Sequence, residues 1–149
     1  ILDLDYDIYA EGEAELGWLN SSLTVTADRE FSLDELLLDI VGSLRTALAA
    51  EDAETAHLKT IGLWEGFYAV ANLVSRESPV ELSLASHCQV REAEVIVNAR
   101  VAVDPNRLES LVKETVANSC GRINGAAAFR QSQSFRPGRP VPTHRITAV

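Results

Sequence analysis

Side chains that could bind a metal ion are few and scattered in this sequence. It has three histidines and two cysteines, and only His87 and Cys88 are neighbours. Zinc and cobalt sites often contain Cys-x-x-Cys or His-x-x-x-His pairs, and neither spacing occurs. His57, His87 and Cys88 are therefore candidate ligands of a metal site that only folding could assemble. Because adjacent residues of an extended chain point to opposite sides, we favour buried thiols and surface imidazoles.

The motifs of nucleotide binding and covalent catalysis are absent from these 149 residues. A phosphate-binding loop has glycine directly before a lysine, but the two lysines, Lys59 and Lys113, follow leucine and valine. The Gly-x-Gly-x-x-Gly and Gly-x-Ser-x-Gly patterns are also missing. We therefore expect no enzymatic activity and no cofactor. The alternative is an enzyme that holds a small acidic or aromatic ligand against Trp18, Trp64 or Tyr68.

Two pairs of polar residues at strand spacing are the candidates for a binding surface. His57 and Lys59 are two residues apart, and Asn98 and Arg100 repeat that spacing. In a strand, each pair points to one face of the sheet. No carboxylate or nucleophile lies beside them in the sequence, so we interpret these four residues as a surface that binds a partner.

The strands that would position these pairs are predicted from the hydrophobic pattern. Apolar and polar residues alternate, or form short apolar runs, over residues 16–27, 56–64, 67–74, 80–84 and 93–103. Glu65 and Gly66, between the second and third of these, predict a two-residue hairpin loop. Residues 2–16 also alternate, with one acidic face, which is typical of an edge strand or of a surface for self-association.

Two helices are predicted from capping residues and apolar spacing. Ser32 and Glu35 form a capping box before an amphipathic stripe that ends near Ala50. Asp104 and Pro105 begin the second helix, for which Gly121 is the expected stop.

This order of elements predicts an α+β two-layer sandwich, in which two helices cover one face of a mostly antiparallel sheet of four or five strands. The arrangement would be similar to the ferredoxin-like fold. We expect one domain over residues 1–124 and an extended tail, rich in proline and arginine, over residues 125–149. The strand order is left open.

The charge of the chain excludes several classes of partner. The formal net charge is −9, which argues against binding to a nucleic-acid backbone. No run approaches the ~20 apolar residues of a membrane span, so we expect no membrane partner. Two cysteines without a secretory signal favour a cytoplasmic location. Residues 1–56 hold 14 acidic side chains against two arginines, and we expect a homo-oligomer or docking to another domain.

Four segments carry a resemblance to a known family. They are residues 56–59 (AHLK), the hairpin that leads to Asn72 and Leu73, residues 98–101 (NARV) and residues 104–108 (DPNRL). Together they resemble the C-terminal domain of the CobW-type GTPases, and residues 9–20 and 135–145 are similar to some relatives. The resemblance covers most of the chain and concerns fold more than chemistry.

This resemblance implies a module that works beside a GTP-hydrolysing metal chaperone, in a family linked to delivery of zinc, cobalt or other ions. The phosphate loop and the cysteine-rich metal motif of that family belong to its GTPase domain, and neither is present in this sequence. The resemblance therefore implies a non-catalytic partner-recognition or regulatory role. A GTPase domain or another protein would dock on the surface formed by His57, Lys59, Asn98 and Arg100. The alternative is a small stand-alone metal-binding protein that holds zinc or cobalt through histidine and cysteine.

Overall fold

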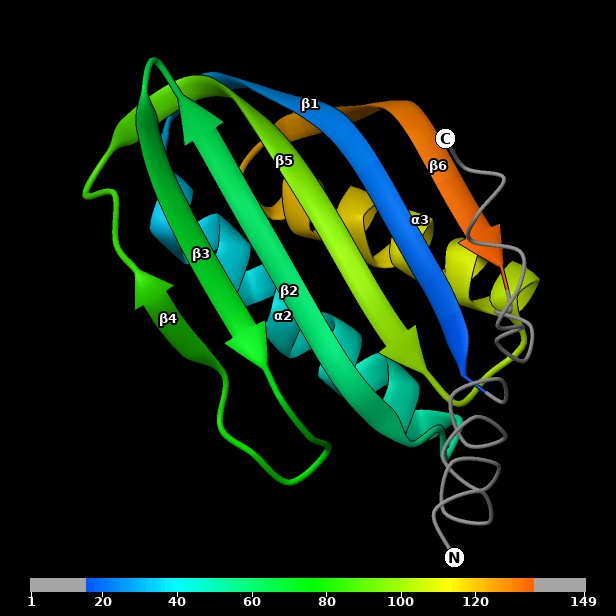
Figure 1. Cartoon of the computed structure of the whole chain (residues 1–149). Helices are drawn as coiled ribbons and strands as arrows, with labels where there is room; N and C mark the ends of the chain where they lie inside the picture. Colours follow the sequence, from blue (N-terminus) through cyan, green and yellow to red (C-terminus); the bar gives the residue numbers. More distant parts are fainter. Residues whose placement is uncertain (1–15, 136–149) are drawn as a thin grey trace, which may run out of the picture.

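The computed structural model describes residues 16–135. It contains a six-stranded sheet and two helices (Figure 1). The strands are β1 (Gly17–Ser32), β2 (Thr55–Trp64), β3 (Phe67–Leu73), β4 (Glu81–Leu84), β5 (Gln89–Val101) and β6 (Gly125–Phe135), and the helices are α2 (Leu33–Ala50) and α3 (Pro105–Arg122).

The strand order is β4-β3-β2-β5-β1-β6, and every pair of neighbours is antiparallel. Strands β1 and β2 are therefore parallel to each other, with α2 connecting them and β5 between them. Strands β5 and β6 repeat this arrangement with α3 and β1. Two interleaved units of this kind are the ferredoxin-like pattern, to which β3 and β4 add a further edge.

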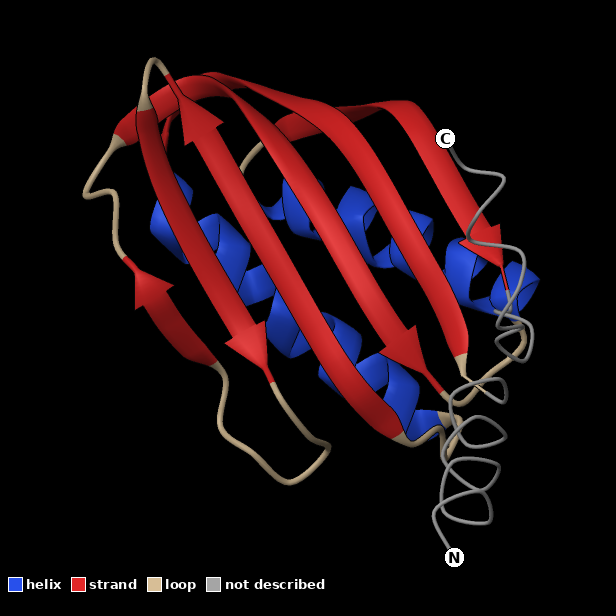
Figure 2. Ribbon diagram, viewed as in Figure 1, coloured by secondary structure: helices blue, strands red, loops and turns tan. Residues whose placement is uncertain are grey.

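Both helices cover the same face of the sheet, as Figure 2 shows. The predicted α+β two-layer sandwich is thus confirmed. No helix among residues 16–135 is long and apolar enough to cross a bilayer.

The sheet has one strand more than the four or five expected. Residues 125–135 form the edge strand β6, which pairs with β1 and is contacted by α3. The predicted boundary at residue 124 is therefore wrong, because the domain continues through this strand. Its alanine, glutamine and serine residues have little intrinsic preference for strands, and the pairing with β1 compensates for that. The predicted strand over residues 2–16 lies outside the described residues except for Leu16, as do residues 136–149.

The helix boundaries follow from local chemistry. The Ser32 side chain accepts a hydrogen bond from the backbone N–H of Glu35 at 3.1 Å, and the Asp104 side chain accepts from Asn106 and Arg107. Gly121 is not the stop that was predicted. Helix α3 continues to Arg122, and the chain turns at Asn124 with φ of 56°, a conformation that asparagine tolerates better than most residues.

The helices and the sheet share one hydrophobic core. The predicted stripe of α2 is buried, together with the matching stripe of α3 and alternate residues of the strands. At Gly62 of β2 a Cβ atom would lie 2.8 Å from the Leu33 side chain, so glycine permits close contact between α2 and the sheet. Glu65 and Gly66 both have positive φ, as a tight two-residue hairpin loop requires.

A buried carboxylate joins the start of α2 to the loop before β5. Asp34 accepts hydrogen bonds from the backbone N–H groups of Ser86 and His87, both at 2.9 Å, and from the Ser86 hydroxyl at 2.7 Å. Burial opposes ionisation, but these hydrogen bonds outweigh it and lower the pKa of Asp34. The ionised carboxylate therefore stabilises the fold.

Replacing Asp34 by alanine should reduce the free energy of unfolding by about 2 kcal/mol, because two backbone N–H groups lose their acceptor. Urea denaturation at neutral pH measures this, and Asp28→Ala, at an exposed position, is the matched control. The contribution exists above the ordinary pKa of 3.8 and disappears as the pH falls through the lower pKa of the folded state. Equal stability of the two variants at neutral pH would contradict this role.

Candidate functional site

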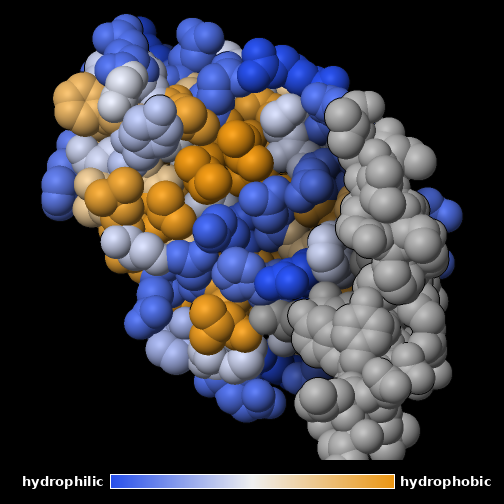
Figure 3. Space-filling view, in the orientation of Figure 1, coloured by the Kyte–Doolittle hydropathy of each residue, from blue (hydrophilic) through white to orange (hydrophobic). Residues whose placement is uncertain are grey.

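The sheet has one face under the helices and one face that no element within residues 16–135 covers. We call the second the open face, and Figure 3 looks directly at it. Strand side chains alternate between the faces, and the burial pattern of β5 follows this alternation, with Val95, Val97 and Ala99 buried and Ile96 and Asn98 only half-buried.

Strand register brings the four predicted partner-binding residues together on the open face. Lys59 of β2 lies opposite Asn98 of β5, and His57 lies opposite Arg100. On the other side of β5, Asn98 lies opposite Asn20, and Arg100 lies opposite Trp18. We call this group the cationic corner; it consists of Trp18, Asn20, His57, Lys59, Asn98 and Arg100. Three segments, each about forty residues from the next in the sequence, thus form one surface.

A shallow cavity of about 240 Å³ opens in this corner, and its lining includes Trp18, Asn20, His57, Asn98 and Arg100. The Arg100 guanidinium lies 5.4 Å from the centre of the Trp18 ring, within the range of a cation–π contact. The Trp18 Nε1 atom is buried and has no hydrogen-bond partner in the described part of the chain. Buried donors are rarely left unpaired, so an oxygen atom of a bound group would satisfy this one.

The electrostatics of the corner favour an anion. Burial lowers the pKa of His57 below 6.5, and the positive charges of Arg100 and Lys59 lower it further. A neutral imidazole therefore lies between two cations at neutral pH. Lys59 is in no ion pair with any residue in the range 16–135. A carboxylate docked here would meet positive charge together with the amides of Asn20 and Asn98.

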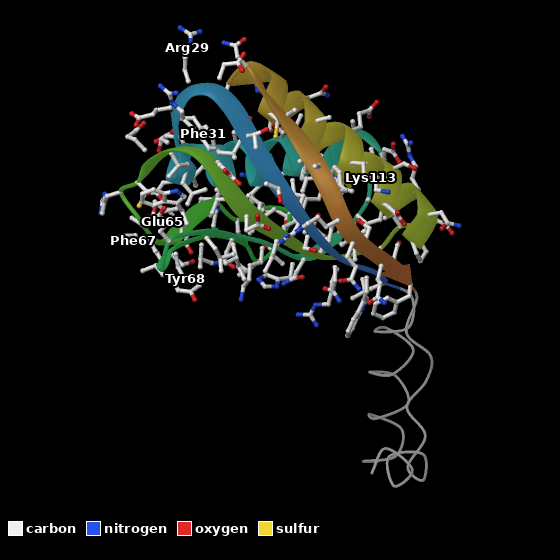
Figure 4. The ribbon with its side chains drawn as sticks, turned by 90° about the horizontal axis from the view of Figure 1, so that it is seen from above. Arg29, Phe31, Glu65, Phe67, Tyr68 and Lys113 are labelled. Carbon is white, nitrogen blue, oxygen red and sulfur yellow. The ribbon has the colours of Figure 1, made fainter. Side chains whose placement is uncertain are left out.

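Next to the corner, the open face becomes apolar. Ile61 of β2 lies opposite both Ile96 of β5 and Val70 of β3. In the following row Leu63 lies opposite Tyr68, which is 51 % exposed. We call these five residues the apolar band. Figure 3 shows apolar residues gathered over the part of the open face that holds the apolar band, bordered by hydrophilic residues. Figure 4 shows Tyr68 on the side of the sheet away from the helices.

The three candidate metal ligands are not brought together. His57 pairs with Arg100 near the end of β5, whereas His87 and Cys88 precede its first residue, Gln89. Eleven residues of strand separate these positions by about 37 Å. No group of three or more histidine, cysteine, aspartate or glutamate side chains that could hold a metal ion occurs among residues 16–135.

Both cysteines are buried and free. The Cys88 thiol donates to the Ser86 carbonyl oxygen at 3.5 Å. Desolvation raises the pKa of Cys120 to about 11, so its thiolate, which is the nucleophilic form, is scarce at neutral pH.

The three aromatic residues considered as a ligand platform are also separated. Trp64 packs against the core and stacks on Phe67, with ring centres 6.1 Å apart. Tyr68 lies at the tip of the β2–β3 hairpin, about 20 Å along the strands from the row of Trp18. Only Trp18 lies in the cationic corner.

A larger groove of about 470 Å³ runs between α2 and α3. Its principal cation, Arg122, donates to the Asp39 carboxylate at 2.8 Å and to the Ser43 hydroxyl at 2.9 Å. These contacts fasten the two helices to each other. The groove therefore serves packing, and the cationic corner is the stronger candidate for a site.

Trp18, Asn20 and the apolar band were not among the predicted partner-binding residues. The alternation in residues 16–27 already placed Asn20 on the polar side of a strand. The residues that lie beside Asn20 on the adjacent strands could not be predicted without the strand order, which pairs β1 and β2 with opposite sides of β5.

Comparison with known proteins gives no match to a family model, to a curated protein or to a solved structure. The function is therefore inferred from the geometry of the open face.

The pKa of His57 should lie below 6.5 when measured by NMR titration of its ring protons. Lys59→Gln should raise that pKa because it removes one of the two nearby cations. Lys113→Gln is the matched control, since Lys113 lies on α3, within 3.0 Å of Glu109, and its loss should leave the titration of His57 unchanged. A His57 pKa at or above 6.5 would contradict the proposed electrostatics.

Proposed function

We propose that this chain is a non-catalytic partner-recognition module whose docking surface is the open face of the sheet. The observation that carries the proposal is the convergence of His57, Lys59, Asn98 and Arg100 on paired strands beside a cavity. The corner offers cations and amide groups, so it suits a partner that presents carboxylates next to an apolar surface.

The resemblance to the C-terminal domain of CobW-type GTPases supports a GTPase domain or a GTPase protein as the partner. Residues 56–59 and 98–101, which carry the resemblance, are paired segments of β2 and β5. Residues 104–108, which also carry it, cap and begin α3 directly after β5. Three of the four segments thus lie at one end of the sheet. Two buried free thiols fit the reducing cytoplasm in which we place the module.

Several weak contacts must act together in such docking. An exposed ion pair contributes about 0.2–1 kcal/mol, so Lys59 alone cannot hold a partner. The half-buried positions of Lys59 and Asn98 restrict their side chains, which reduces the entropy lost on binding. Contact with the apolar band next to the corner would add the hydrophobic part of the affinity.

A hexaglutamate peptide tests the recognition of carboxylates. In two-dimensional NMR at low salt, we expect saturable shifts for Trp18, Lys59 and Asn98, with Kd of roughly 0.1–1 mM. Lys59→Gln should weaken binding about 3- to 5-fold, the equivalent of one exposed ion pair, whereas Lys113→Gln should not change it. Binding should weaken at high salt. Hexaglutamine is the control peptide, and equal shifts with both peptides, or none with either, would refute the proposal.

A further inference from the structure

We propose that one partner of the open face is a second copy of this chain, docked sheet against sheet. The inference rests on the proposed function, because it identifies an occupant of the same surface. Three features of the described residues support it: an apolar centre, an area of the size that dimers bury, and opposite charges at the two ends of the face.

The centre of the face is apolar and lies where a symmetry axis would pass. Ile61, Val70 and Ile96 lie side by side across three strands. Under a two-fold axis that runs across the strands at this row, these residues meet their own equivalents in the second copy. Interfaces between identical subunits are self-complementary in this way, and aliphatic side chains pack on themselves without leaving a polar group unpaired.

The area is sufficient for a stable dimer. Six strands at their usual spacing make a face about 25 Å wide, and the paired rows extend about 30 Å along the strands. The result, on the order of 800 Å² per copy, is the size of one side of a standard protein interface. Two twisted sheets pack well with their strands about 30° apart.

Charge determines the direction of docking. The cationic corner lies at one end of the face, and Glu65, Glu92 and Glu94 lie at the other, beside the apolar band. Glu94 is already bound by Thr24 and Arg130, whereas Glu92 is exposed and in no ion pair within residues 16–135. We call Glu65, Glu92 and Glu94 the acidic end.

An axis across the strands places the cationic corner of one copy over the acidic end of the other. Along β5, Arg100 and Glu92 are each four residues from Ile96, so a rotation about the row of Ile96 exchanges their positions. An axis parallel to the strands would instead put cation over cation. Complementary charge at an interface fixes orientation in this manner.

Sedimentation equilibrium of the full chain tests the proposal. The wild type should be a dimer, and Ile61→Gln should raise its dissociation constant about 100-fold, because each substitution enters the interface twice. Ala117→Gln, at an exposed position of α3, is the matched control and should leave the dimer intact. Circular dichroism should show that both variants fold. A monomeric wild type, or equal association by both variants, would overturn the proposal.

The direction of docking is tested by charge reversal. Glu92→Lys should weaken the dimer about 10-fold, because it brings a cation over the cationic corner of the second copy. Glu114→Lys makes the same change in net charge on α3 and should have no effect. An unchanged dissociation constant for Glu92→Lys would exclude the proposed axis.

Acetylation with acetic anhydride measures how accessible Lys59 is on the open face. Lys113 on α3 is the internal reference, since Lys59 and Lys113 are the two lysines of the chain. Protection of Lys59, relative to Lys113, should increase with protein concentration. Protection that is equal at all concentrations would indicate an occupant from the same chain and would overturn the proposal. If the wild type is monomeric but hexaglutamate still binds at Lys59, the second copy is excluded while the proposed recognition function stands.

Discussion

The pleat of the β-strands is the constraint on which the rest of this structure depends. Each strand residue must point either to the helices or to the open face, and the sequence uses the first set for stability. Leu23, Val95 and Val97 are fully buried with the apolar stripes of α2 and α3. Because burial of one such side chain contributes about 1.5–3 kcal/mol, this layer supplies the free energy of folding, and the residues of the open face are available for other roles.

The use of the open face follows from its composition. A face exposed only to water would be expected to be polar, yet Ile61, Val70 and Ile96 occupy its middle. These three side chains are only half-buried, and apolar patches on protein surfaces commonly mark contact surfaces. The corner beside them gathers cations, amides and an indole N–H without a partner in residues 16–135 around a cavity. This geometry supports the proposed recognition of a carboxylate.

Local patterns in the sequence predicted much of the fold. The Ser32 and Asp104 caps and the Glu65-Gly66 loop are where the sequence placed them, because each depends on neighbours within a few residues. Strand β6 was missed, since its stability comes from pairing with β1 and not from its own composition. The candidate site was predicted in part: alternation placed His57 with Lys59 and Asn98 with Arg100, but only the strand order shows that the two pairs meet and that Trp18 joins them. The role of Asp34 was not predicted, because its hydrogen-bond partners are more than fifty residues away in the sequence.

A comparison of two adjacent residues tests most directly whether the two faces have separate roles. Val97 is fully buried under the helices, and Ile96 lies on the open face. In dilute solution, where association is absent, Val97→Ala should lower the free energy of unfolding by about 2–3 kcal/mol and Ile96→Ala by less than about 1 kcal/mol. At higher concentration, Ile96→Ala should weaken self-association at least 10-fold, whereas Val97→Ala should preserve it under conditions where it stays folded. If Ile96→Ala destabilised the monomer as strongly as Val97→Ala and left association unchanged, the open face would belong to the fold, and the two faces would not have separate roles.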